Sequence, residues 1–322
     1  MKTKPLPFLL ALVVFFASCS KTPAVFPPSG EPVSPPAEEE ISLPDVPALF
    51  AGASVVGSVQ SSATKSLVNG VSYTAISCTL TSGLKENVFI VAADLNSGKL
   101  ALRTALPYNS TVTPQGAWTL QSLSDMSYYL ELIGHDPIAM INADFWNTST
   151  FIPRGPVHCQ GTVVWSVFEP NGSSQQGISF VGWSKTAGFD ILPSSEYESK
   201  ASSFTEVTGS GVFLVNDGKA VDNSSVSLAR HPRTAIGYSE KGVVFFFCVD
   251  GRDEGVSEGM TYDEMGSIFV ALGCKEAVNL DGGGSTQMLV RDPQTLATSL
   301  VNKPSDQKPR AVVNGWTLYL AE

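Results

Sequence analysis

The chain has 322 residues, of which 43% are hydrophobic and only 16% are charged, so it is able to bury a substantial core. Its net charge of −10 comes without any block of basic residues. This charge pattern argues against a nucleic-acid partner.

The N-terminal residues have the pattern of an export signal. Lys2 and Lys4 precede an apolar run over residues 8–16, which is too short to span a membrane as a stable helix. The stretch FASC then resembles a bacterial lipobox. We therefore expect a signal peptide over 1–18 and lipidation of Cys19; an ordinary signal peptide with an incidental Cys19 is the alternative. The expected location is the bacterial cell envelope, periplasmic or surface-facing, with only the lipid anchor in the membrane.

A proline-rich segment with an acidic cluster at 38–40 follows Cys19. It lacks the hydrophobic periodicity needed to pack, which is typical of an extended, solvated spacer. No second segment of this kind occurs later in the sequence. We therefore predict a lipidated cysteine and tether over 19–65 and one folded domain over 66–322.

Four cysteines remain in the predicted domain, and none belongs to a C-x-x-C or a closely spaced Cys/His set. A structural zinc site is therefore disfavoured. An exported chain offers the chance of disulfides, and Cys248 with Cys274 is the candidate pair. Buried free thiols are the alternative for all four, Cys78, Cys159, Cys248 and Cys274.

In chain order, the domain is predicted to form many short strands with few helices. Residues 87–95 and 99–106 flank NSG, VFLV precedes NDGK, and residues 234–238 and 243–249 flank SEKG. Each of these three patterns indicates a hairpin. Residues 117–133 carry apolar positions at helical spacing and end at Gly134, which predicts a helix.

A second helix is predicted after the run VVFFFCVD. Thr261 and Glu264 form a capping box, and Gly273 follows the last apolar position. With AVNLD after it, this helix completes a pattern that is typical of a right-handed parallel strand–helix–strand unit. VVFFFCV has no polar alternation, which predicts a strand covered on both faces. The expected fold is α+β, a single domain with a mixed, strand-rich sheet that contains this one parallel unit.

Acidic residues follow three of the predicted strands. Asp250 and Asp281 end the two strands of the parallel unit, and the apolar run PIAMINAD ends with Asn142 and Asp144. Ligands of such sheets gather at the carboxyl ends of the strands. We therefore expect these three carboxylates to meet at one edge and to form the catalytic group.

Three consecutive glycines follow Asp281 in NLDGGGSTQM. Without Cβ atoms, Gly282, Gly283 and Gly284 let the backbone approach a ligand closely, and their N–H groups are predicted to form a nest for an anion. No G-K-[ST] follows and TQMLV continues as a strand, so this is not a nucleotide P-loop. A bulged turn of structural glycines is the alternative.

Arginines supply the second element of the predicted site. Arg230 and Arg233 precede a strand, and Arg252 lies two residues beyond Asp250. Arginine recognises phosphate or carboxylate with paired hydrogen bonds, so these three are candidate phosphate ligands, with surface ion pairs as the alternative. Ser285 lies in no G-x-S-x-G elbow and is not expected to be an acyl-transfer nucleophile. Trp146 is the best candidate for stacking on a sugar, with core burial as the alternative.

Carboxylates, arginines and a glycine nest together suggest a substrate with a glycosyl group joined to phosphate. The leaving group of a sugar 1-phosphodiester is a weak base, so a carboxylate that stabilises an oxocarbenium-like transition state carries more of the catalysis. Two alternatives stay open: a non-catalytic glycan-binding surface lipoprotein, and a metal-assisted phosphoesterase in which the three acids hold a divalent cation. No other cofactor is expected.

The same stretches resemble the phosphodiester glycosidase family, which includes the catalytic domain of the mannose 6-phosphate uncovering enzyme. The resemblance extends from about residue 88 to 320 and is carried by INADFW, HPRTAIGY, VDGR, SEGMTYDEM, NLDGGGSTQM and RAVVNGW. It implies hydrolysis between the anomeric carbon of a sugar and a phosphodiester oxygen, with a phosphate-linked glycan as substrate and a phosphomonoester as product. The site residues it implies are Asn142, Asp144, Arg233, Thr234, Asp250, Gly251, Arg252, Asp281, Gly282, Gly283, Gly284, Ser285 and Asn314.

Overall fold

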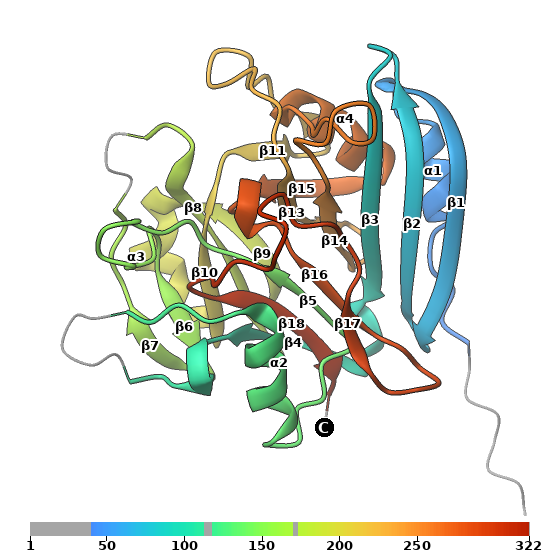
Figure 1. Cartoon of the computed structure of the whole chain (residues 1–322). Coiled ribbons are helices and arrows are strands. Elements are labelled where there is room, and N and C mark those ends of the chain that lie inside the picture. Colours follow the sequence, from blue (N-terminus) through green and yellow to red (C-terminus); the bar gives the residue numbers. More distant parts are fainter. Residues whose placement is uncertain (1–39, 113–117, 170–172, 322) are drawn as a thin grey trace, which may run out of the picture. The chain divides into compact units, whose positions relative to one another are not determined.

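Three antiparallel sheets form the core of the protein (Figure 1). The computed structural model describes residues 40–112, 118–169 and 173–321. In these residues an eight-stranded sheet lies beside two five-stranded sheets. The expected signal peptide, Cys19 and residues 20–39 of the expected tether lie outside the described residues.

The strands follow one another in a different order in space than in sequence. The eight-stranded sheet has the order β1 (Val56–Val68), β2 (Val71–Leu80), β3 (Lys85–Asp94), β14 (Val243–Val249), β13 (Arg233–Ser239), β15 (Cys274–Asn279), β11 (Phe213–Asn216), β12 (Lys219–Ala220). A second sheet has the order β7 (Thr162–Trp165), β6 (Val157–Cys159), β10 (Glu206–Gly211), β8 (Gln176–Ser184), β9 (Gly188–Pro193). The third has the order β17 (Thr298–Leu300), β16 (Met288–Arg291), β5 (Ala139–Asn142), β18 (Gly315–Leu320), β4 (Leu100–Ala105).

The helices of the described residues are short. They are α1 (Val46–Ala51), α2 (Leu123–Glu131), α3 (Tyr197–Lys200) and α4 (Tyr262–Ala271), with 3-10 turns that include η5 (Gly283–Ser285). The predicted capping box of α4 is confirmed: Thr261 accepts from the Glu264 N–H, and the Glu264 side chain accepts from the Thr261 N–H. Among the described helices, none is long and apolar enough to cross a bilayer.

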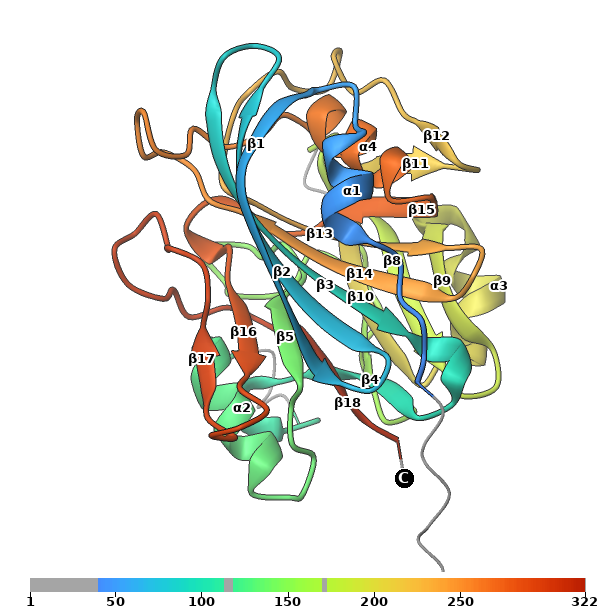
Figure 2. The ribbon, with the colours of Figure 1, turned by 90° about the vertical axis from the view of Figure 1, so that its right-hand side faces the viewer.

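The central strands of the eight-stranded sheet are covered on both faces. Phe245 and Phe247 of β14 point into a core shared with α1 and α4, while Phe246 and Cys248 point into a core shared with the third sheet. Figure 2 shows α1 and α4 in front of this sheet. The far face of the third sheet is covered in turn by α2. The uninterrupted apolar run of β14 therefore has the predicted cause, burial on both sides.

The predicted parallel strand–helix–strand unit is wrong, and the sheets are antiparallel where a mixed sheet was expected. β14 and β15 do not pair, because β13 lies between them and is antiparallel to both. Two antiparallel steps restore the direction of the chain, so β14 and β15 still run the same way. Val249 pairs with Arg233, and Asn279 pairs with Ala235. The carboxyl ends of both strands therefore lie at one edge of the sheet, beside the start of β13.

The hairpin predictions have a mixed outcome. β13 pairs with β14 and β11 pairs with β12, as the SEKG and NDGK turns predicted. The NSG hairpin is wrong, because β3 pairs with β2 and β14 whereas β4 pairs with β18 in another sheet. A turn signal fixes the local reversal but not the sheet that each flanking strand joins. Cys248 and Cys274 are both free and buried, so the candidate disulfide is absent.

The folded unit begins earlier in the chain than residue 66. It extends from Glu40, and α1 and most of β1 lie in the segment that was assigned to the tether. Val46 and Phe50 of α1 are buried in the core shared with α4. A helix of this length is too short to show a clear helical periodicity in the sequence. Its stability comes from tertiary packing, which the sequence pattern does not show.

Replacing Phe50 with alanine tests whether α1 belongs to the fold. Phe50 is fully buried, so Phe50→Ala is expected to lower the free energy of unfolding by about 3–5 kcal/mol. Chemical denaturation measures this change. The matched control is Leu228→Ala, because Leu228 is 69% exposed and its truncation is expected to cost less than about 0.5 kcal/mol. Equal, small effects of both variants would contradict the placement of α1.

Candidate active site

The ends of β15 and β5 meet although they belong to different sheets. The Asp281 N–H donates to the Ala143 carbonyl at 2.8 Å, and Asn142 Nδ2 donates to the Asp281 carbonyl at 2.7 Å. Asn142 Oδ1 accepts from Thr234 Oγ1 at 2.7 Å and from the Gln287 N–H at 3.0 Å. The predicted residues Asn142 and Thr234 thus fasten β5, β13 and β15 together and fix the position of Asp281.

Asp144 lies in the interior, beneath two close backbone segments. Its side chain is 1% exposed, and Oδ2 accepts from the Gly155 N–H at 2.9 Å. A Cβ at Gly209 would lie 2.5 Å from Oδ2, so glycine is required there for this approach. Burial raises the pKa of Asp144 well above its usual range, the hydrogen bond from Gly155 opposes this, and the charge of Asp281 adds to it. Burial at this position therefore favours the neutral, protonated form of Asp144.

Asp281 is partly exposed and is the accessible member of this acid pair. Its removal from water raises its pKa to about 6, while hydrogen bonds from Ser285, the Gly282 N–H and Trp146, together with the charge of Arg310, lower it. At neutral pH this carboxyl is mainly ionised. The two carboxyls interact, and the protonated form is favoured more strongly at the enclosed Asp144 than at Asp281.

The three glycines after Asp281 make room for the Pro232 carbonyl and for arginine side chains. A Cβ at Gly282 would lie 2.7 Å from the Pro232 carbonyl and 3.7 Å from Arg233 Cδ. A Cβ at Gly283 would lie 3.0 Å from Arg252 Nη2, and one at Gly284 would overlap Arg310 Nη2. We call this arrangement the arginine cradle; its members are Gly282, Gly283, Gly284, Arg233, Arg252 and Arg310.

Two of the three N–H groups of the predicted nest have acceptors within the protein. The Gly282 N–H donates to Asp281 Oδ1 at 2.9 Å, and the Gly283 N–H donates to the Pro232 carbonyl at 2.8 Å. These donors are therefore occupied within the protein. The glycines serve the site by lacking side chains, and the arginines provide the positive charge.

Arg233 is the buried arginine of the cradle, at 5% exposure. Its Nε donates to the Met260 carbonyl at 3.1 Å, its Nη2 donates to the Ala229 carbonyl at 2.8 Å, and its Cζ lies 4.1 Å from the centre of the Tyr262 ring. Within the described residues, these partners hold the guanidinium without an ion pair to a carboxylate. That charge remains available to an anionic ligand.

Arg252 is exposed and has a positive φ of 61°, which is uncommon for a residue other than glycine. Its Nη2 lies 3.3 Å from His231 Nδ1. Burial, followed by the charges of Arg233 and Arg252, lowers the pKa of His231. His231 is therefore neutral at pH 7, and the positive potential of this region comes from guanidinium groups.

Arg230, the remaining predicted arginine, forms its contacts with groups outside the arginine cradle. It forms an ion pair with Glu264, donates to the Gly259 carbonyl at 3.0 Å and lies 3.7 Å from Glu86. Glu264 is the capping residue of α4. Arg230 therefore ties the segment before β13 to the start of α4, which is the ion-pair alternative named from the sequence.

Asp250 reaches the same edge of the sheet but contacts a different segment. Its Oδ1 accepts from the Lys303 N–H at 2.9 Å and from Asn302 Nδ2 at 3.2 Å, and Asn302 Nδ2 also donates to the Thr286 carbonyl. Burial raises the pKa of Asp250 to about 6, and these hydrogen bonds lower it. The structure thus brings Asp144 and Asp281 together and uses Asp250 to anchor the segment that leads to Arg310.

The other predicted residues are close-packed supports. Asn314 Oδ1 accepts from the Asp144 N–H at 2.9 Å, and a Cβ at Gly251 would lie 2.7 Å from the Pro232 N atom. Ser285 is fully buried, hydrogen-bonds to Asp281, and lies with its Oγ 3.5 Å from Arg310 Nη1. Asn314 Nδ2 and Asp144 Oδ1 are buried without a hydrogen-bond partner among the described residues.

Sequence reasoning missed Arg310 as a member of the site. It begins the stretch RAVVNGW, which was noted only for its resemblance to the family, and it lies far along the chain from the other arginines. Trp146, named only as a stacking candidate, contacts Asp281 directly, and its ring centre lies 5.9 Å from that of Phe151. Neither contact leaves a signal in local sequence, because each is formed between separate segments.

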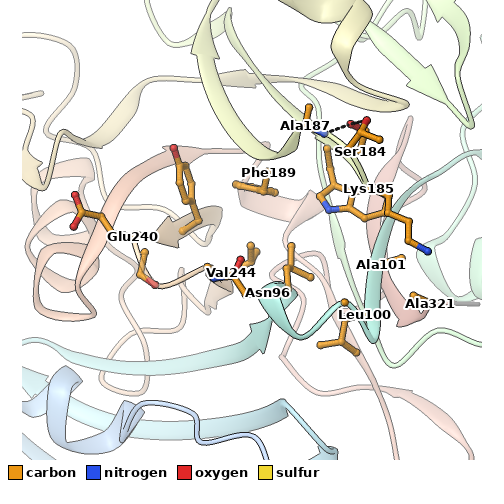
Figure 3. A pocket seen from close by; sticks show the side chains of 18 of the residues that line it. Asn96, Leu100, Ala101, Ser184, Lys185, Ala187, Phe189, Glu240, Val244 and Ala321 are labelled. Atoms are coloured by element: carbon orange, nitrogen blue, oxygen red, sulfur yellow. Dashed lines mark hydrogen bonds between the residues drawn. The ribbon is translucent and has the colours of Figure 1, made fainter.

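A separate hollow of about 730 Å³ lies at the other end of β13 (Figure 3). Its lining includes Phe189, Trp183 and Tyr238, with Lys185 and Glu240 among the charged groups. None of the predicted site residues contributes to it. Across residues 40–112, 118–169 and 173–321, no three His, Cys, Asp or Glu side chains gather in a set that suits a metal ion.

Substitution of Trp146 with phenylalanine tests its contact with Asp281. The change keeps an aromatic ring but removes the indole N–H. In the unaltered protein this N–H donates to Asp281 and stabilises its charged form. The pKa of Asp281 is expected to rise above about 6, as measured by carbon-13 NMR of the side-chain carboxyls. Trp118→Phe is the control, since Trp118 Nε1 donates to the Val313 carbonyl. An unchanged pKa in Trp146→Phe would contradict the contact.

Comparison with known proteins identifies the fold. The catalytic domain of zebrafish N-acetylglucosamine-1-phosphodiester alpha-N-acetylglucosaminidase, auto-inhibited by its pro-peptide, is 18% identical with a TM-score of 0.59, covering 80% of this chain and 88% of that one. A hypothetical protein from Synechocystis is 16% identical with a TM-score of 0.55, covering 81% and 64%. At these identities the likeness concerns the fold.

Sequence comparison carries the family assignment. The uncharacterized SPbeta prophage-derived protein YomE of Bacillus subtilis (strain 168) is 38% identical over 112 residues. The match spans 34% of this chain but only 16% of that relative, so most of its length has no counterpart here. A sequence model of the phosphodiester glycosidase family matches residues 135–319, which is more than half of the chain and contains the acid pair and the whole arginine cradle. The chain therefore belongs to the phosphodiester glycosidase family.

Proposed function

We propose that this protein is a hydrolase that cleaves the anomeric C–O bond of a sugar 1-phosphodiester. The reaction releases the sugar and leaves a phosphomonoester. The observation that carries this proposal is the contact between the Asp144–Asp281 pair and the arginine cradle, which puts a divided acid pair beside three cationic groups. Membership of the phosphodiester glycosidase family supports a glycosidase-type function.

The arginine cradle holds the phosphate in this proposal. Guanidinium groups bind phosphate oxygens through paired hydrogen bonds, and they also stabilise the charge that the leaving oxygen gains. Arg233 is fixed by carbonyls and a ring, so its geometry exists before the substrate binds. Arg252 is exposed, and its guanidinium lies beside Gly283. A phosphodiester fits this charge better than a neutral glycoside does.

The acid pair acts on the sugar. The ionised Asp281 stabilises the positive charge that develops at the anomeric carbon, and Asp144 keeps its proton, so the site holds a single carboxylate charge. As the C–O bond breaks, its electron pair stays with the phosphate oxygen. A water oxygen then bonds to the anomeric carbon, and its proton passes to the Asp281 carboxylate, which later releases it to solvent. Asp250 acts as a positioning residue, through its hydrogen bonds to Asn302 and Lys303.

Export and anchoring belong to the same proposal. We propose that the protein acts outside the cytoplasm on a phosphate-linked glycan of the cell envelope or of foreign origin, held by a lipid at Cys19. The support is the sequence pattern of residues 1–19, which lie outside the described residues. The chain acts without nucleic acid in this scheme, and its membrane contact is the lipid alone.

Hydrolysis in isotopic water tests the reaction itself. With a synthetic glycosyl phosphodiester in ¹⁸O-labelled water, the label is expected in the released sugar, because water attacks carbon. Asp281→Asn is expected to lower turnover about a thousand-fold, since the charge that meets the transition state is lost. Mass spectrometry of both products measures the label.

The same experiment separates the alternatives. Label in the phosphate would show attack at phosphorus and favour a phosphoesterase. Glycan binding with no sugar released after long incubation would favour the non-catalytic protein. Asp292→Asn is the control for Asp281→Asn, because Asp292 pairs with Lys65 on the exposed surface; it is expected to retain full turnover.

The pH dependence of kcat/KM is a further test. Burial raises the pKa of Asp281 to about 6, so its charged form is lost as the pH falls through about 6. Activity is therefore expected to rise between about pH 5 and pH 7 and to level off above that. Asp250 has a pKa of about 6 as well. The rising limb is expected to persist in Asp250→Asn, and its disappearance there would contradict the assignment to Asp281.

A further inference from the structure

An ion pair between Asp306 and Arg310 covers the last glycine of the cradle. Arg310 Nε donates to Asp306 Oδ2 at 2.9 Å, and Nη2 lies 2.7 Å from the same oxygen. A Cβ at Gly284 would overlap both Arg310 Nη2 and Asp306 Oδ2. Gly284 has no positive φ. The close approach of this ion pair, rather than the backbone conformation, therefore requires glycine at 284.

Arg310 faces the acid pair as well as Asp306. Its Nη1 lies 3.5 Å from Ser285 Oγ, and its charge lowers the pKa of Asp281. Within the described residues, Arg310 is the arginine of the cradle that pairs with a carboxylate, and this carboxylate is Asp306. Arg233 is held by carbonyls and Arg252 contacts a neutral histidine. The Asp306 carboxylate sits where an incoming anion would meet Arg310.

The segment that carries this ion pair is anchored at both ends. Gln287 Nε2 donates to the Arg310 carbonyl at 2.7 Å, and Asn302 joins Asp250 to the Thr286 carbonyl. Between these anchors the side chain of Asp306 is 35% exposed. Asp306 is therefore free to swing into solvent while the backbone of Arg310 stays in place.

We propose that Asp306 is an internal anion that occupies Arg310 until the phosphate of the substrate displaces it. Asp306 is then a specificity-determining residue of the site. It keeps ordinary small anions from filling the cradle, because each must compete with a carboxylate that is already in place. This inference rests on the proposed function, in which the displacing group is the phosphate of a sugar phosphodiester.

Binding of inorganic phosphate to the full chain tests this inference by isothermal titration calorimetry. Asp306→Asn removes the competing charge and keeps the shape of the side chain. The variant is expected to bind phosphate roughly fivefold more tightly than the unaltered protein, the factor that matches the worth of a partly exposed ion pair. Asp306→Ala is expected to change the affinity in the same direction and guards against a local effect of the asparagine.

Two controls make the sign of the result decisive. Asp292→Asn makes the same change in net charge at an ion pair beyond the other end of β16, and it is expected to leave the affinity within about twofold. Arg310→Gln is expected to weaken phosphate binding roughly tenfold. An unchanged affinity in Asp306→Asn would overturn the proposal. A weaker affinity would overturn it too, because Asp306 would then be a residue that merely positions Arg310.

The outcome is separable from that of the proposed function. Phosphate binding is measured without turnover, so a tighter Asp306→Asn variant supports the internal anion even if no glycosyl phosphodiester is cleaved. If sugar is released but the phosphate affinity of Asp306→Asn is unchanged, the proposed hydrolase activity is supported and the proposed role of Asp306 is overturned. Inhibition of turnover by inorganic phosphate is expected to be stronger in Asp306→Asn than in the unaltered protein.

Discussion

The site depends on a stretch of backbone that lacks three side chains. At Gly282, Gly283 and Gly284 the space of each Cβ is taken by a neighbouring group: the Pro232 carbonyl at Gly282, and guanidinium groups at Gly283 and Gly284. Three like charges gather at one place only if each has a partner of its own. The structure gives them carbonyls and an aromatic ring at Arg233, a neutral histidine at Arg252 and a carboxylate at Arg310.

The two carboxyls of the acid pair differ in their pKa values because they differ in burial. Asp144 is enclosed by Gly155 and Gly209, whereas Asp281 lies partly in solvent a short distance along the β5–β15 junction. Desolvation disfavours the charged form of both groups, and more strongly for the enclosed one. Since two interacting carboxyls resist double ionisation, the proton is favoured on Asp144 and the charge on Asp281. Neither residue type nor spacing in the sequence carries this distinction.

The central sheet explains why distant acids reach one edge. β13 separates β14 from β15, and its antiparallel pairing to both restores their common direction. The third sheet packs on the same strands and brings the end of β5 to that edge. Asp250 arrives there as well, but its hydrogen bonds go to Asn302 and Lys303. Its task in the structure is to hold the segment that presents Arg310 and Asp306.

The sequence by itself determined the local features. Four features follow from side-chain chemistry over a few residues. They are the capping box at Thr261, the burial of β14 on both faces, the acids at strand ends and the need for glycine after Asp281. Only the tertiary structure decided which strands pair, which acid is enclosed and which arginine faces the glycines. Those outcomes depend on contacts between residues that are far apart in the chain, such as Gln287 with Arg310, and such contacts leave no periodic pattern in the sequence.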